Sequence, residues 1–323
     1  IAATTIDING AINASGEIIA ASLDISGDID VDGTTNLDVV DIDGAANFAA
    51  DVTFADGADI ITASAGTSNV RFGVNAGNSI VSGGNKNVLI GDEAGTAITT
   101  GDYNIALGYQ ALALEDTGER SVAIGHQALR SQNAAGLNYN TAVGFTAGEL
   151  ITTGVNNTLI GALAGDAITT GDNNVVLGMS ALTANTTGAQ NVSIGSASLE
   201  VNTTASNNTA VGFKSLNKNT TGTRNNAFGS LSLDATTTGG YNNAFGFNSL
   251  GANTTGEENV AMGDNAMADN TTGDKNTAFG TSSLANNTTA DNNTAIGYAA
   301  LNANTTGAQN VSLGAYSMTA NTQ

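Results

Sequence analysis

The sequence predicts an all-β fold, a parallel β-solenoid (β-roll) of stacked coils, and three observations lead to it. A pair made of an apolar residue and a glycine recurs at almost every seventeenth position. The 323 residues include no proline, as expected where every interior coil donates its backbone N–H groups to a neighbour. The chain holds 41 glycines and no tryptophan, so any core must be thin and made of small side chains.

The repeat unit is recognised by its glycine, which occurs in 15 units from Gly73 to Gly314. Successive glycines lie seventeen positions apart, except for 18 after Gly73 and 19 after Gly125. The residue before this glycine is apolar in every unit, and three residues after it stands Ala or Ser. Four residues before it stands Asn in 14 of the 15 units, with Ser121 as the exception. Each unit therefore carries the same structural positions.

One unit has room for two short strands and two turns. In the strand predicted at 174–177, Val175 and Leu177 share one face, while Asn174 and Val176 share the other. We expect the apolar residue before the glycine to be packed on one side, and the small residue two before it to face a tighter space. We expect this glycine and that of Asn-Thr-Thr-Gly to supply positive φ at the corners.

Stacking places equivalent residues about 4.8 Å apart, so each position of the repeat becomes a ladder along a rod about 70 Å long. Asn ladders satisfy one another's amides. A face of small residues also favours lateral association with other chains. The predicted structural ladder comprises Asn104, Asn174, Asn191, Asn208, Asn225, Asn242 and Asn276 with Gly108, Gly178, Gly195, Gly212, Gly229, Gly246, Gly263, Gly280 and Gly297.

Residues 1–68 lack the repeat unit but alternate apolar and acidic residues, as in Ile29-Asp30-Val31-Asp32-Gly33. Strands this short do not form a stable sheet alone, which predicts pairing with other chains in a β-prism or triple β-helix. The sequence therefore predicts two domains, an acidic β-rich segment at 1–68 and a fifteen-coil β-roll at 69–323.

Charge and composition exclude several classes of partner. The net charge of −21 argues against nucleic acid and against an anionic membrane surface. No apolar run approaches the length of a membrane span. The absence of cysteine rules out disulfides and cysteine-based zinc sites, and we expect no cofactor.

Two features imitate functional sites. Residues 28–33 resemble the start of a calcium loop, but Val39 stands where a bidentate Glu is needed. Strand alternation explains these acids, with a weak cation site between chains as the alternative. His126 is the only histidine and lacks the partners of a catalytic triad, so we expect a surface turn residue and no enzyme.

Three irregularities leave alternatives open. The expansion at 131–136 is a candidate contact loop or plain turn variation. Arg71 stands where later units carry Ala, so its coil is a loosened cap or its column is less crowded. Seven Asn-Thr-Thr triplets are formal N-glycosylation acceptors, although the repeat itself explains them; they begin at Asn185, Asn202, Asn219, Asn253, Asn270, Asn287 and Asn304.

The segment 293–307, Asn-Thr-Ala-Ile-Gly-Tyr-Ala-Ala-Leu-Asn-Ala-Asn-Thr-Thr-Gly, resembles the repeats of bacteriophage tail-fibre proteins and of bacterial tail-fibre-domain surface proteins. It is also similar to the head repeats of trimeric autotransporter adhesins, whose units are shorter than the unit of this chain. The resemblance covers about residues 69–323. It implies a trimer of left-handed parallel β-rolls, exposed on a virion or outside a cell and binding a host surface.

We therefore expect a structural and adhesive extracellular fibre, a phage tail-fibre shaft in host attachment. Its expected partners are two further copies of itself, fibre or baseplate proteins at the N-terminal side, and a host cell-surface glycan or protein. A bacterial surface adhesin of the trimeric autotransporter type is the alternative.

Two other classes are weaker. An ice-binding solenoid needs matched outward threonines, whereas Thr186 and Thr187 point to opposite faces. A polysaccharide-cutting enzyme needs paired carboxylates in a cleft with aromatic platforms, and the chain has no tryptophan and no large insertion.

Overall fold

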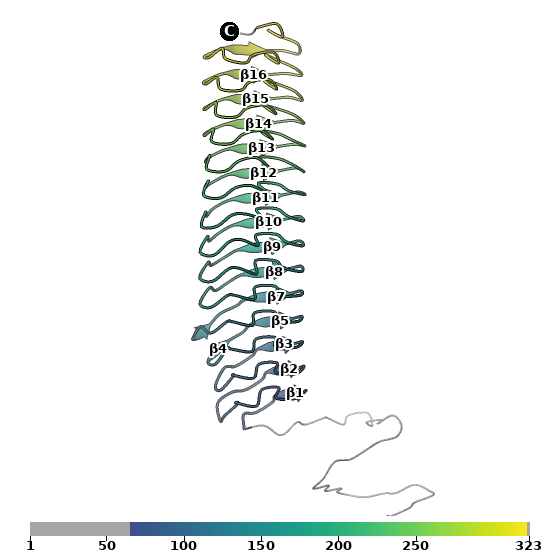
Figure 1. Cartoon of the computed structure of the whole chain (residues 1–323), viewed down its shortest axis with the longest axis vertical. Helices are drawn as coiled ribbons and strands as arrows, with labels where there is room; N and C mark the ends of the chain where they lie inside the picture. Colours follow the sequence, from purple (N-terminus) through teal and green to yellow (C-terminus); the bar gives the residue numbers. More distant parts are fainter. Residues whose placement is uncertain (1–64, 322–323) are drawn as a thin grey trace, which may run out of the picture. The chain divides into compact units, whose positions relative to one another are not determined.

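The computed structural model describes residues 65–321, and these residues form a parallel β-solenoid of about 14 turns (Figure 1). The all-β prediction is confirmed, since no helix occurs among the residues described. The same stretch consequently has no helix that could cross a membrane. The predicted pairing of residues 1–68 with other chains, including the calcium-like segment at 28–33, concerns almost entirely residues outside the described part.

One long sheet runs the length of the stack, with 15 parallel strands in chain order. Equivalent positions pair from coil to coil, as Val192 does with Thr209. The register advances by one regular repeat except between β1 and β2, where Val70 pairs with Val88, and between β5 and β7, where Val122 pairs with Thr141. The strands are β1 (Val70–Phe72), β2 (Val88–Ile90), β3 (Ile105–Leu107), β5 (Val122–Ile124), β7 (Thr141–Val143), β8 (Thr158–Ile160), β9 (Val175–Leu177), β10 (Val192–Ile194), β11 (Thr209–Val211), β12 (Asn226–Phe228), β13 (Asn243–Phe245), β14 (Val260–Met262), β15 (Thr277–Phe279), β16 (Thr294–Ile296) and β17 (Val311–Leu313).

Each coil contributes one strand of three residues to this sheet, so the expectation of two strands per coil is wrong. Left-handed residues interrupt the rest of the coil. In one coil Asn173, Ser180 and Leu182 have φ of 58°, 55° and 54°. Their N–H groups still bond neighbouring coils, as Leu182 does with the Ser198 carbonyl at 3.0 Å. The coil is thus a series of tight bends held from above and below.

The glycine after each strand does have positive φ, between 112° and 148°. At Gly178 a Cβ would also lie 2.6 Å from the carbonyl oxygen of Gly195. The prediction is wrong for the glycine of Asn-Thr-Thr-Gly. Gly188, for example, is not in the positive-φ region, and the equivalent place is filled by Ala205 and Ala290 in other coils. That position needs a small residue because the next coil approaches closely.

The core is a thin column inside the stack. The middle residue of each strand points inward, and Ala210, Ala227 and Ala244 are fully buried there. Leu182 and its equivalents four residues after the strand-end glycine supply one large side chain per coil. The expectation of a tight space for the small residue is confirmed by this burial.

Some coils exchange the position of their large residue. Gly95 and Gly165 occupy the place of the core leucine, and Ile98 and Ile168 fill the core from three residues later. A Cβ at Gly165 would lie 2.7 Å from Cδ1 of Ile168. The isoleucine side chain therefore occupies the space that a side chain at position 165 would need. Where glycine takes the leucine position, the strand itself can also carry a leucine: Leu89 accompanies Ile98, and Leu159 accompanies Ile168, all fully buried.

The first coil uses the same exchange. Gly77 stands at its leucine position, and Arg71 Nε donates to the Ala76 carbonyl oxygen at 2.6 Å. Arg71 is half-buried. The column is therefore less crowded in this coil, which is one of the two alternatives for Arg71.

Candidate functional site

The outer face of the fifteen-stranded sheet is the candidate functional surface. The first and third residues of each strand point away from the core because side chains alternate along a strand. We call these two columns the outer strip. Its third-position residues were expected to be packed, but within a single chain they lie outside: Leu177 is 45% exposed, while the middle residue Val176 is fully buried.

The third-position column of the outer strip is apolar along the whole stack. The third position is Phe, Ile, Leu, Val or Met in all 15 strands, and the first position is Val, Ile, Thr or Asn. Fifteen strands about 4.8 Å apart make a strip about 70 Å long, and two columns make it roughly 10 Å wide. The resulting area of about 700 Å², apolar in one column and mixed in the other, approaches the ~800 Å² per partner of a stable interface.

Strands β12 and β13 carry the same residues at both positions of the strip. Phe228 and Phe245 stack with ring centroids 4.9 Å apart at an interplanar angle of 5°. Beside them, Asn226 Nδ2 donates to Asn243 Oδ1 at 2.8 Å. These two strands have the only asparagines in the first position of the strip.

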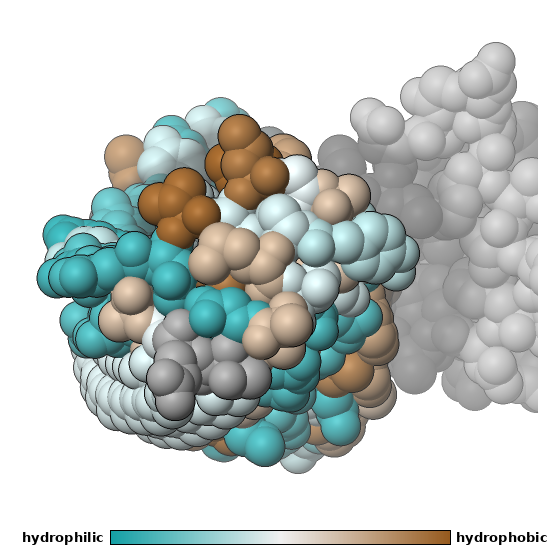
Figure 2. Space-filling view, turned by 90° about the horizontal axis from the view of Figure 1, so that it is seen from above, coloured by the Kyte–Doolittle hydropathy of each residue, from teal (hydrophilic) through white to brown (hydrophobic). Residues whose placement is uncertain are grey.

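Viewed along the rod, equivalent side chains lie behind one another in rows, most clearly in the pale row at the lower left (Figure 2). The apolar end of the stack is formed by β17, where Val311 and Leu313 are 73% and 75% exposed. Every surface feature of a coil is thus repeated along the rod as a row.

The predicted asparagine ladder forms a buried column against the backbone. Asn174 Oδ1 accepts the backbone N–H of Asn191 at 3.0 Å. Asn174 Nδ2 donates to the carbonyl oxygen of Gly188 at 3.0 Å and to Asn157 Oδ1 at 3.1 Å. Asn104 and Asn191 to Asn276 are likewise fully buried, and the predicted glycines stack at the strand ends. The amides therefore bond the neighbouring backbone more than one another, and they hold coils together.

A second asparagine ladder comes from the Asn-Thr-Thr triplets. Asn202 Nδ2 donates to Asn185 Oδ1 at 3.0 Å and to the Ala205 carbonyl oxygen at 3.1 Å. Asn185 and its equivalents are fully buried. An N-linked glycan needs this same nitrogen, so the folded coil cannot carry one at these positions. The explanation of these triplets by the repeat itself agrees with this ladder, but that these asparagines form a second ladder was not predicted.

A buried polar network explains the exception at Ser121 and the expansion at 131–136. Gln132 Nε2 donates to Ser121 Oγ and to Glu115 Oε2, both at 2.8 Å. Gln132 Oε1 accepts from Asn140 Nδ2 at 2.8 Å. Gln132 thus bridges the ladder where Ser121 is too short. Glu115 also accepts Gly118 N–H at 2.7 Å and Asn138 Nδ2 at 3.0 Å, so its buried carboxylate is well bonded.

The expansion also adds a two-stranded sheet, β4 (Gly118–Glu119) with β6 (Gly136–Leu137). Leu137 is half-exposed there, whereas Gln132 is buried. The loop therefore has an inward, structural side, and its role as a contact loop stays a prediction.

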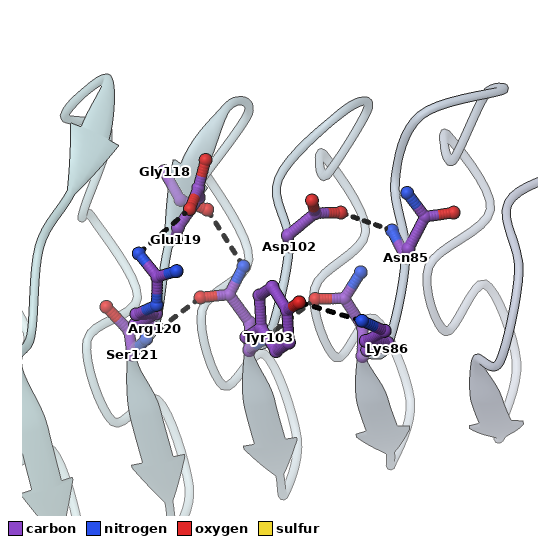
Figure 3. Close-up of polar contacts among 10 residues, drawn as sticks. Asn85, Lys86, Asp102, Tyr103, Gly118, Glu119, Arg120 and Ser121 are labelled. Carbon is purple, nitrogen blue, oxygen red and sulfur yellow. Dashed lines mark hydrogen bonds and ion pairs between the residues drawn. The ribbon is translucent and has the colours of Figure 1, made fainter.

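Cations and aromatic rings alternate on one edge of the coils that precede the expansion (Figure 3). Lys86 Nζ lies 4.7 Å from the ring centroid of Tyr103 and donates to its hydroxyl at 2.7 Å. Arg120 lies over the rings of Tyr103 and Tyr139 at 5.2 and 5.9 Å. The hydrogen bond to Tyr103 raises the pKa of Lys86. Lys86 thus lies at the hydroxyl end of Tyr103 and Arg120 lies over its ring, while the tyrosine stays 43% exposed.

His126 belongs to a similar aromatic row. Its ring centroid lies 5.2 Å from that of Tyr109 and 5.1 Å from that of Phe145. The histidine therefore continues a stack of flat side chains at a turn, and no acid or hydroxyl contact of a triad accompanies it in the described contacts.

The acidic residues include two with shifted titration. Burial raises the pKa of Asp166, and the charge of Glu149 in the preceding coil adds to the shift. Burial also raises the pKa of Asp234, which Lys218 partly opposes. Glu149 itself is paired with Arg130 at 2.9 Å. These acids form rows of carboxylates along the rod instead of a cleft.

Residues 65–321 hold no pocket, and over the same range no cluster of three or more His, Cys, Asp and Glu could hold a metal ion. No family model, curated protein or solved structure matches this chain.

Proposed function

We propose that this chain is the shaft of an extracellular fibre in which three copies lie side by side along their outer strips. The observation that carries the proposal is the strip itself: a surface about 70 Å long with an apolar side chain in every coil. Three parallel rods bury these surfaces together and give a stalk thicker and stiffer than one coil.

A partner for the strip must match its spacing. The strip presents one pair of side chains every coil, about 4.8 Å apart. A second copy of this chain has the same period over the same length, so each coil meets an equivalent coil. This match favours self-association over a globular partner.

The setting of the fibre rests on the repeat. The segment 293–307 supports a phage tail-fibre shaft that joins fibre or baseplate proteins at its N-terminal side to a host glycan or protein. A bacterial surface adhesin of the trimeric autotransporter type has the same assembly and is the second candidate. The ice-binding option is weak because Thr186 Oγ1 donates to the Thr203 carbonyl oxygen at 3.2 Å, which leaves Thr187 as the outward hydroxyl.

Light scattering of the purified chain tests the assembly. Three chains of 32.0 kDa give 3 × 32.0 = 96 kDa. A strip variant with Leu107→Gln, Leu177→Gln and Phe279→Gln loses roughly 1 kcal/mol of apolar burial per side chain, so it should dissociate at a concentration at least about tenfold higher.

The matched control carries Thr170→Gln, Thr187→Gln and Thr272→Gln, which are exposed positions outside the strip. We expect the control to keep the assembled mass. A wild-type mass of one chain, or a strip variant as stable in assembly as the control, would overturn the proposal.

A further inference from the structure

The outer strip carries asparagine in two neighbouring strands. Among the 15 strands of the sheet, only β12 and β13 carry asparagine at the first position, Asn226 and Asn243, where other strands have Val, Ile or Thr. Both side chains are half-buried in the single chain. They lie beside Phe228 and Phe245, the stacked pair of the strip.

The hydrogen bond between the two amides leaves one acceptor and one donor group of the pair free to bond another molecule. Asn226 Nδ2 donates to Asn243 Oδ1, and no other hydrogen bond involves either side chain in the described part of the chain. Asn226 therefore presents an acceptor oxygen, and Asn243 presents donor hydrogens, one coil apart on an apolar surface.

Register is a real problem for this surface. The coils repeat so closely that two strips displaced by one coil, about 4.8 Å, would make nearly the same apolar contacts. A repeated apolar surface therefore favours association without defining the alignment. A polar group inside such a surface can define it, because misalignment leaves that group against apolar side chains.

We propose that Asn226 and Asn243 set the register between parallel copies of the chain, an inference that rests on the proposed self-association. In the aligned assembly each pair meets the same pair of another copy, and amide meets amide. A displacement by one coil sets Asn243 of one copy against Val260 of another, and a displacement by two coils mispairs both asparagines.

Single cysteines report the alignment, since the natural chain has none. Thr158→Cys is introduced in a tagged copy, and Thr158→Cys, Val175→Cys or Val192→Cys in an untagged copy expressed with it. These three positions of the strip correspond to offsets of zero, one and two coils. An offset of two coils, about 9.6 Å, exceeds the reach of a disulfide, whose Cα atoms lie about 4.4–6.8 Å apart.

In the natural background we expect cross-linking mainly at zero offset. With Asn226→Val and Asn243→Val in both copies, we expect the assembly to persist and the ratio of zero-offset to two-coil cross-links to fall at least tenfold. Valine fits because it occupies the same position in β9 and β10. The control, Thr209→Val with Thr277→Val, removes polar groups from the same column and should keep the natural ratio.

The outcomes separate the two proposals. A light-scattering mass of one chain in the natural background would contradict the self-association itself. An assembled mass with equal cross-linking at zero and two-coil offsets would overturn the register inference alone. Assembly with an unchanged cross-linking ratio in the Asn226→Val, Asn243→Val variant would overturn the register inference alone. A ratio that falls equally in the threonine control would also overturn it.

Discussion

The side-chain oxygen of Asn174 accepts the backbone N–H of Asn191, one coil further along the stack, at 3.0 Å. The same relationship joins most successive coils, and the amide nitrogen bonds a carbonyl at the opposite corner. A buried asparagine therefore replaces the backbone contacts that a continuous strand would provide, at the point where the coil bends.

Asn174→Ala should destabilise the stack by about 1–3 kcal/mol, because it leaves the buried Asn191 N–H without a partner. The Gly188 carbonyl loses one of its two donors and keeps Asn185 Nδ2 at 2.9 Å. Native-state hydrogen exchange at the Asn191 amide measures the effect locally, which suits a repeat protein that need not unfold in one step. Thr187→Ala, at an exposed position, is the control. Unchanged protection of Asn191 would contradict the role of the ladder.

The two kinds of glycine should respond differently to alanine. Gly178→Ala forces a side chain into φ of 145° and into contact with the Gly195 carbonyl, so we expect a loss of about 3 kcal/mol. Gly188→Ala should cost less than Gly178→Ala, because its φ is not positive and Ala205 and Ala290 occupy the same position naturally. Its cost is the shift needed to move the new Cβ away from the Ala205 carbonyl oxygen, from which it would lie 2.3 Å. Thermal unfolding of both variants makes the comparison. Equal losses would show that the strand-end glycine has no special requirement.

Thr236→Asn should stabilise the chain. The second asparagine ladder is interrupted at Thr236, and the buried Oδ1 of Asn219 in the preceding coil has no partner. An asparagine at 236 would donate to it as Asn219 Nδ2 donates to Asn202 Oδ1 at 2.9 Å. The expected gain is about 1 kcal/mol in the free energy of unfolding. A loss of stability would mean that the column is too narrow at this coil.

Asp166→Asn should stabilise the chain at neutral pH. Burial raises the folded-state pKa of Asp166 above its ordinary 3.8, so the folded carboxylate carries a penalty that grows as pH rises from the ordinary value through the raised one. Asn217, at the same repeat position, donates to Glu200 Oε2 at 2.7 Å, and Asn at 166 can bond Glu149 in the same way.

Unfolding curves at several pH values measure this effect. The advantage of Asp166→Asn over the natural chain should shrink as pH falls through the raised folded-state pKa of Asp166 toward the ordinary 3.8, and titration should contribute nothing below that value. An advantage that does not depend on pH would exclude titration of Asp166 as its cause.

The glycine period predicts the solenoid and the number of its coils because each coil needs one residue in a conformation that only glycine adopts easily. The sequence could not show which face of the strand lies inside. Val175, Val176 and Leu177 are all apolar, so alternation alone does not decide. The decisive factor is the leucine four residues after the glycine, such as Leu182. It fills part of the coil, so the middle strand residue is no larger than valine where this leucine is present, as with Val176.

The bends of the coil could not be predicted either. Leu182 and Ser180 adopt left-handed conformations because hydrogen bonds to adjacent coils hold them there, and residue type alone gives no sign of this. The network around Glu115 did leave a signal. Ser121, Gln132 and the longer spacing after Gly125 all depart from the repeat within one stretch, which indicates a shared cause.

Cryo-electron microscopy of the purified chain tests the central claim most directly, because side-by-side rods and single rods differ in cross-section. We expect particles with three β-solenoids in parallel, an axial spacing of about 4.8 Å, and the outer strips facing one shared axis. Isolated rods with Leu177 and its equivalents facing solvent would contradict the account.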